Sequence, residues 1–268
     1  MLESDPLRQV ARMLWSLLPY LPLGLLAGLL SGVLGIGGGL VFSPLLLLAG
    51  LDPHQALATS TLAIVPTTLG GTWAHLRNRS LPWRGGLAIV LGAGLGAGLF
   101  SQVGLVLHGW MLLAMQALMY GGLALSFRPP SAQAASDTPS LKLAGLTATG
   151  MVAGIATGLL GLGGGLVMVP LMVQLMQVPI HLAIRFSTLA VLTSASVAST
   201  TFLLDGRALL PIGMLLGGTA AVAARWSAAR LDRVSDGQLT WLLRALTLLL
   251  ALDSGRRALA LLLLSLPG

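Results

Sequence analysis

The side chains of this sequence that could bind a small anion include an arginine inside an apolar stretch. Arg185 lies within a predicted membrane span. On insertion scales such an arginine costs roughly 2.5–3.5 kcal/mol and usually marks a transport pathway or an ion pair. Its guanidinium fork matches an oxyanion in bidentate geometry. The alternative is that Arg185, a few residues after Pro179, lies at the membrane edge and extends its charge to the interface.

Hydroxyl side chains recur at matching places in the two halves of the chain. They are Ser60, Thr61, Ser187 and Thr188. Each could donate a hydrogen bond to a substrate oxygen, or could bond back to a carbonyl of its own helix, as is common in membranes. His54 and His181 also occupy nearly matching positions, in predicted turns. Because histidine titrates near neutral pH, they could couple transport to protons, or they could be ordinary loop residues.

Two glycine-rich segments are the strongest repeat in the sequence. The first glycine segment spans residues 28–44 and the second spans residues 154–170. Their closing prolines, Pro44 and Pro170, stand 126 residues apart, and six glycines recur at the same spacing. Chance does not account for such a match, so the sequence predicts a tandem duplication.

Each glycine segment contains three consecutive glycines inside a hydrophobic stretch. Such a run removes helix propensity and permits left-handed backbone. Backbone broken at membrane depth must be buried in protein or line a wet cavity. A helix that starts just after the break offers free N–H groups and about half a positive charge to an anion. We therefore predict substrate binding by Gly37, Gly38, Gly39, Gly163, Gly164 and Gly165. The alternative is that the glycines only allow close helix packing.

The composition indicates a membrane protein. The chain has 268 residues, of which 55% are hydrophobic and 9% charged, and its mean hydropathy is +0.89. A soluble domain carries roughly 25% charged residues. The net charge of +7 comes from arginines in short loops between apolar stretches, which orientation in the membrane explains, so nucleic acid is not an expected partner. With no cysteine and no acidic residue clearly within a span, we expect neither a metal site nor a cofactor.

Each half is predicted to contain about four spans and one half-length segment after the glycines. The first half has spans near 14–34, 55–76, 85–107 and 110–127 and a short segment at 40–49. The second half has spans near 143–160, 183–204, 210–229 and 239–251 and a short segment at 166–176, followed by an apolar piece at 258–266. We predict a first transmembrane repeat over 1–127, a polar linker over 128–142, a second repeat over 143–252 and a C-terminal apolar tail over 253–268.

Basic residues in the loops bear on orientation. If the short segment crosses the membrane, each half has five crossings and the two halves have opposite orientation. Placing loops 77–84, 128–142 and 225–233 in the cytoplasm gathers eight basic residues there against five on the other face. The predicted fold is an all-α polytopic protein of the cell inner membrane, with two homologous halves arranged as inverted repeats.

The doubled pattern Gly-x-x-x-Gly-x-x-Gly-x-Gly-Gly-Gly, closed by a proline, resembles the TauE/SafE-type sulfite exporter (TSUP) family of membrane anion transporters. The continuation from Pro53 through Ser60, echoed from Pro179 through Ser187, belongs to the same resemblance. The likeness covers about residues 20 to 250. It implies a secondary transporter of small sulfur-containing or organic anions, such as sulfite or sulfonates. It also suggests export and proton coupling. The halves depart from one another where Arg185 stands at the place of Ala58.

Three classes of function compete. The leading hypothesis is an anion transporter working by alternating access about the paired glycine segments. An anion channel is the alternative, since channels also use helix N-termini. A membrane enzyme would need a nucleophile–base pair or a His/Asp metal cluster at depth, which the sequence does not contain. Besides the substrate, the expected partner is the lipid bilayer; the sequence predicts no oligomeric state.

Overall fold

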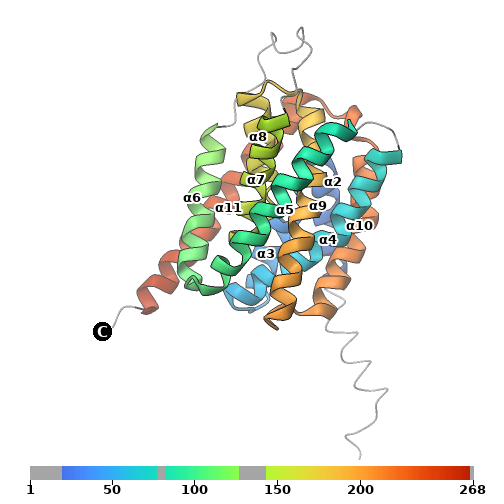
Figure 1. Ribbon diagram of the computed structural model, residues 1–268. Helices are drawn as coiled ribbons and strands as arrows, with labels where there is room; N and C mark the ends of the chain where they lie inside the picture. Colours follow the sequence, from blue (N-terminus) through green and yellow to red (C-terminus); the bar gives the residue numbers. More distant parts are fainter. Residues whose placement is uncertain (1–19, 78–81, 127–142, 266–268) are drawn as a thin grey trace, which may run out of the picture.

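The computed structural model describes residues 20–77, 82–126 and 143–265, and these residues form helices and connections without strands (Figure 1). The first half contains α2 (Tyr20–Leu34), α3 (Gly39–Leu48), α4 (Pro53–Arg77), α5 (Trp83–Val106) and α6 (Gly109–Ser126). The second half contains α7 (Leu143–Leu160), α8 (Gly165–Leu175), α9 (Ile180–Leu204), α10 (Leu210–Ala228), the short η2 (Leu231–Arg233) and α11 (Asp236–Ser265).

The order of helices repeats as the sequence predicts. A helix leads to each glycine segment, and a short helix of 10 residues (α3) or 11 residues (α8) follows it. Three helices, α5, α7 and α9, are long and apolar enough to cross a membrane. The all-helical membrane fold is thereby confirmed in its coarse form. The predicted linker over 128–142 and the first residues of the span predicted over 14–34 lie outside the described residues.

The C-terminal region differs from the sequence expectation. A break was expected between a span ending near 251 and an apolar piece starting at 258, but α11 continues through the boundary predicted at residue 253. The charges that suggested a break are paired along the helix. Asp253 accepts hydrogen bonds from Arg256 at 3.1 Å and from Arg257 at 2.9 Å. Because residues three and four apart share a helix face, these pairs stabilise the helix.

The two halves are interleaved. In the repeat, α5 corresponds to α10 and α2 to α7. α5 packs most extensively against α7 of the other half, and α10 packs against α2 in the same way. The pairs α5–α9 and α10–α4 are likewise counterparts, while α6 and α11 lie side by side at one edge (Figure 1). α4 and α9 pack directly against one another, so the equivalent helices of the two halves meet inside the bundle.

Small residues allow these close contacts. A Cβ atom on Gly28 of α2 would overlap the backbone of Ala220, and one on Gly154 of α7 would overlap the backbone of Ala93. These outer glycines of the two segments therefore serve helix packing, as expected of Gly-xxx-Gly spacing between membrane helices. The inner glycines have a different conformation and different neighbours.

Candidate functional site

The inner glycines break the backbone in the way the sequence predicts. Gly35, Gly37 and Gly38 have φ angles of 67°, 76° and 78°, and Gly161 and Gly163 have φ angles of 63° and 64°. In this left-handed region glycine incurs no Cβ penalty, whereas other residues are strained. α3 and α8 begin directly after these breaks, at Gly39 and Gly165.

The two breaks contact one another inside the bundle. A Cβ atom on Gly39 would lie 2.8 Å from the carbonyl oxygen of Leu162, and one on Gly163 would lie 3.0 Å from that of Ile36. Ile36 and Leu162 are buried. The duplicated segments therefore form one paired structure in the core, to which each half contributes one short-helix N-terminus.

Among the first three residues of each short helix, half of the amides have no hydrogen-bond acceptor among the described residues. Neither Gly38 nor Gly164, the residues that precede α3 and α8, makes a side-chain cap. The amides of Gly39, Leu40 and Leu166 have no hydrogen-bond partner among the described residues. Helix N-termini leave such donors free for solvent or a ligand, and the helix dipole favours a negative charge there. The pair of breaks thus presents N–H donors from both halves.

Ser60 and Ser187 connect the halves reciprocally. Ser60 Oγ donates to the carbonyl of Gly161 in the second segment at 3.5 Å and to that of Gly39 at 3.3 Å. Ser187 Oγ donates to the carbonyl of Gly35 in the first segment at 2.7 Å. Both serines are buried. The structure therefore brings these two predicted residues to the paired breaks, where each bridges to the other half.

Thr61 and Thr188 bond within their own helices. Thr61 Oγ1 donates to the carbonyl of Leu57 at 2.7 Å, and Thr188 Oγ1 donates to that of Ile184 at 3.0 Å. This is the back-bonding that the sequence left open as the alternative. Thr61 Oγ1 lies next to Gly161 of the second break, where an added Cβ would come within 2.8 Å of it. In this conformation both threonine hydroxyls donate their protons to carbonyls of their own helices.

Arg185 lies in the second turn of α9, two residues before Ser187, and is half-buried. Its counterpart in the first half, Ala58, is fully buried. The structure places this residue near the start of its helix, so substrate contact by Arg185 stays a prediction.

Two further polar residues lie near the second break, Thr157, which the sequence did not single out, and Gln116, an amide within a predicted span. Thr157 Oγ1 accepts a hydrogen bond from the amide of Gly164 at 2.7 Å and contacts Ser194 Oγ at 2.9 Å. Gln116 Nε2 donates to the carbonyl of Leu160, which precedes the second break, at 3.0 Å. In the repeated motif Thr157 occupies the position equivalent to Ser31 of the first half. A hydroxyl side chain at the same place in both halves was the sequence signal that could have identified Thr157 as part of the site.

α4 also carries buried polar groups beyond the breaks. Thr72 Oγ1 is buried and has no hydrogen-bond partner among the described residues. His75, in the last turn of α4 close to Arg77, is only 3% exposed. This face of α4 is therefore turned into the protein.

His54 and His181 make equivalent hydrogen bonds. His54 Nε2 donates to the carbonyl of Leu107 at 2.8 Å, and His181 Nε2 donates to that of Val234 at 3.1 Å. Both belong to the first turn of a long helix, α4 or α9, rather than to a turn before it. Since a carbonyl can only accept, each bond requires a proton on Nε2. His54 therefore links α4 to the connection between α5 and α6, and His181 links α9 to the connection between α10 and α11.

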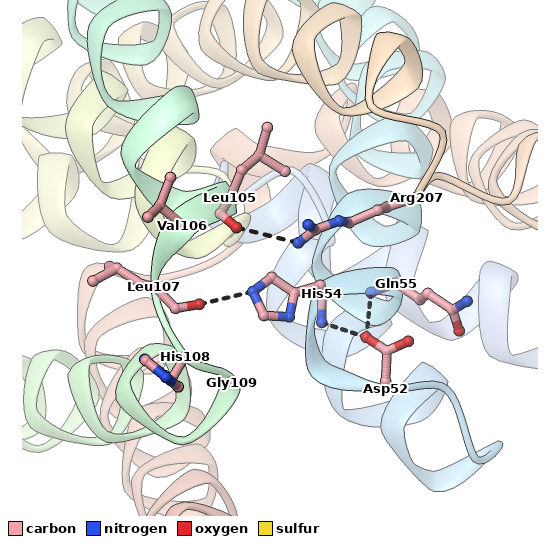
Figure 2. A pocket seen from close by; sticks show the side chains of 9 residues that line it. All are labelled: Asp52, His54, Gln55, Leu105, Val106, Leu107, His108, Gly109 and Arg207. Atoms are coloured by element: carbon pink, nitrogen blue, oxygen red, sulfur yellow. Dashed lines mark hydrogen bonds between the residues drawn. The ribbon is translucent and has the colours of Figure 1, made fainter.

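A cavity of about 490 Å³ surrounds the first of these histidines (Figure 2). Asp52, His54, His108 and Arg207 line it, and Arg207 donates to the carbonyl of Leu105 at 3.2 Å. Asp52 Oδ1 accepts from the amides of His54 and Gln55 and so caps α4. Arg207 is paired with Asp205 at 2.6 Å. The described residues contain no group of three His, Cys, Asp or Glu side chains that could hold a metal ion.

The repeated helices, the paired glycine breaks and the apolar spans define a polytopic helical membrane protein of the transporter class. Residues 20–253 match the family model described as "Sulfite exporter TauE/SafE". The chain belongs to this family, as the resemblance of its motifs predicted. Family and relatives are membrane transporters and not enzymes, which agrees with the non-enzyme prediction.

Similar proteins from several organisms are also named as membrane transporters or as members of the TauE/SafE family. The chain is 32% identical over 235 residues to a "Probable membrane transporter protein" of Xylella fastidiosa, covering 82% of this chain and 90% of the relative. It is 27% identical over 236 residues to "Probable membrane transporter protein YunE" of Bacillus subtilis, covering 75% of this chain and 85% of the relative. A short stretch of 39 residues is 54% identical to "Sulfite exporter TauE/SafE family protein 6" of Arabidopsis thaliana, covering 15% and 9% of the two chains. No solved protein structure matches the chain significantly.

Proposed function

We propose that this protein is a secondary transporter that exports small sulfur-containing or organic anions, such as sulfite or sulfonates, across the cell inner membrane. The observation that carries the proposal is the meeting of two glycine breaks, followed by short helices whose first turns carry unpaired amides, at Gly39 and Leu40 in α3 and at Leu166 in α8. These donors suit an oxyanion without requiring a buried cation. In this proposal the six inner glycines and the hydroxyls of Ser60, Thr61, Ser187 and Thr188 surround the anion, and Arg185 supplies a positive charge at its approach.

Alternating access is supported by the arrangement of the halves. Gly37–Gly39 and Gly163–Gly165 are buried, so a solute reaches them only when helices move. A channel would need a path that stays open, which makes it the less favoured alternative. In the proposed mechanism the two halves are inverted repeats that rock about the paired breaks. The reciprocal packing of α5 on α7 and α10 on α2 agrees with a pseudo-twofold axis.

The substrate class rests on the family. Its description names sulfite, and the Arabidopsis relative carries the same word.

In the proposed organisation, residues 1–127 and 143–252 are the two repeats, 128–142 links them and 253–268 completes the C-terminus. Proton coupling belongs to the proposal because the resemblance to the family suggests it.

Thermal unfolding of the detergent-purified protein with a panel of anions tests the proposal. The panel comprises sulfite, sulfate, thiosulfate, sulfoacetate, taurine, pyruvate and chloride. A ligand that binds only the folded state raises stability by mass action, by about 2.7 kcal/mol at a hundred times its Kd. Selective stabilisation by sulfite or a sulfonate is the expected result. Stabilisation by pyruvate alone would move the substrate to carboxylates, and the absence of any shift would oppose the proposed site.

A further inference from the structure

A second candidate site lies at the surface where α4 and α10 end. A groove with a volume of about 490 Å³ runs between the two helix ends, and we call it the α4–α10 groove. It is separate from the paired glycine breaks. Its lining combines three arginines with two tryptophans: Arg77, Arg225, Arg230, Trp73 and Trp226.

The groove concentrates positive charge. Among the described residues, its lining contains no aspartate or glutamate. Arg77, Arg225 and Arg230 make no ion pair with a described side chain. Arg207 and Arg257, by contrast, are each paired with an aspartate. The three cations of the groove therefore remain available to an anionic ligand.

Arg230 is held in a fixed position. Its guanidinium carbon lies 3.9 Å from the centre of the Trp226 ring, and its Nη1 donates to the carbonyl of Trp226 at 3.0 Å. This stacking leaves the other N–H groups of the guanidinium for a further acceptor. A preorganised arginine loses less conformational entropy when it binds a phosphate.

The rim of the groove is apolar and faces outward. Trp73 is 59% exposed, Trp226 is 56% exposed and Val222 is 70% exposed. Tryptophans of membrane proteins gather at the level of the lipid headgroups, next to the acyl chains. The groove therefore places cations at headgroup level and apolar side chains where acyl chains would pass.

We propose that the α4–α10 groove binds the phosphodiester headgroup of an anionic phospholipid from the surrounding bilayer. The arginines donate charge-assisted hydrogen bonds to the phosphate oxygens, and Trp73, Trp226 and Val222 contact the acyl chains. Arg77, Arg225 and Arg230 belong to the segments 77–84 and 225–233, which are predicted to face the cytoplasm, whose leaflet is rich in anionic lipid. A small free anion would not use the apolar rim, so the structure favours a lipid over a soluble phosphate.

Native mass spectrometry of the full-length protein in detergent tests this assignment. The probes are dioleoyl-phosphatidylglycerol and dioleoyl-phosphatidylcholine, which share their acyl chains and differ in net charge. We expect the wild type to prefer phosphatidylglycerol by about tenfold or more in apparent Kd. The triple variant Arg77→Gln, Arg225→Gln, Arg230→Gln should lose most of that preference.

A charge-matched variant controls for net charge. Arg84, Arg244 and Arg256 are exposed and lie outside the groove, so Arg84→Gln, Arg244→Gln, Arg256→Gln removes the same charge elsewhere. This variant should keep the preference for phosphatidylglycerol. Equal loss in both triple variants, or no preference in the wild type, would overturn the proposal. Displacement of the lipid by an excess of inorganic phosphate would also overturn it, in favour of a free-anion site.

A second measurement does not depend on the arginine variants. Phosphatidylglycerol with brominated acyl chains should quench the fluorescence of Trp73 and Trp226 more strongly than brominated phosphatidylcholine does. The difference should disappear in the variant Trp73→Phe, Trp226→Phe. Equal quenching by both lipids in the wild type would contradict a headgroup-selective site.

Discussion

Gly163 illustrates how a single residue fixes the candidate site. Its φ of 64° is left-handed, and an added Cβ would lie 2.9 Å from Val191 Cγ1 and 3.0 Å from the carbonyl oxygen of Ile36. We expect Gly163→Ala to lower the free energy of unfolding by about 1–3 kcal/mol, through strain and overpacking. Thermal unfolding in detergent measures the change. Gly218→Ala is the matched control, because Gly218 is helical and its Cβ would meet no atom within 4 Å. An equal effect of both changes would contradict the role assigned to the break.

At the same scale, variants of Ser60 and Ser187 test anion binding, and variants of Thr61 and Thr188 test stabilisation within a helix. The double variant Ser60→Ala, Ser187→Ala removes the hydroxyls that bridge the halves, and we expect it to abolish the ligand-induced thermal shift. The loss of buried hydrogen bonds should also lower stability by about 1–3 kcal/mol per carbonyl left unpaired. Thr61→Ala with Thr188→Ala, which removes only back-bonds within the helices, should affect stability less. An unchanged thermal shift in the serine variant would remove both serines from the site.

Arg185 gives a third test at the residue scale. Arg185→Ala should abolish anion binding, and Arg185→Lys should restore it in part because the charge returns without the bidentate fork. Arg244→Ala, at an exposed position of α11, removes a charge away from the site and should leave binding intact. Ligand titration followed by tryptophan fluorescence or by thermal shift distinguishes the variants. Full affinity in Arg185→Ala would support the interfacial interpretation of this residue instead.

At the scale of elements, the matched histidines attach α4 and α9 to helix connections elsewhere in the bundle. His54→Ala removes the hydrogen bond to the carbonyl of Leu107, and His181→Ala removes the equivalent hydrogen bond to that of Val234. We expect each change to lower stability by about 0.5–1.5 kcal/mol, with similar values because the two contacts are equivalent in the repeat. Anion affinity should stay the same in both variants. Loss of affinity with unchanged stability would instead indicate a functional role, such as proton coupling.

Helices with strong local signals could be predicted from the sequence, and those that depend on long-range contacts could not. The breaks at Gly35–Gly39 and Gly161–Gly165 follow from glycine's own propensity, so the short helices α3 and α8 were expected. The continuity of α11 was missed because Asp253, Arg256 and Arg257 suggest a polar break until their mutual pairing is seen. The cross-half bonds of Ser60 and Ser187 were inaccessible, since only tertiary packing decides which carbonyl a hydroxyl reaches.

At the scale of the whole molecule, inverted repeats require equivalent loops to face opposite sides of the membrane. The connections after α4 and after α9 are equivalent, and the natural chain contains no cysteine. We therefore expect Pro82→Cys and Gly206→Cys to react with a membrane-impermeant maleimide from opposite sides in vesicles of known orientation. Reaction of both from the same side would exclude the inverted arrangement and the rocking motion built on it.

Transport in proteoliposomes tests the central claim most directly. Vesicles containing purified protein would be loaded with unlabelled sulfite and diluted into ³⁵S-labelled sulfite, with the Ser60→Ala, Ser187→Ala variant as the inactive comparison. The proposed transporter predicts saturable accumulation of label driven by exchange, which the double variant loses. A current through planar bilayers that rises linearly with anion concentration, without exchange, would show a channel instead. The absence of flux for every anion of the panel would contradict anion transport at the paired glycine breaks.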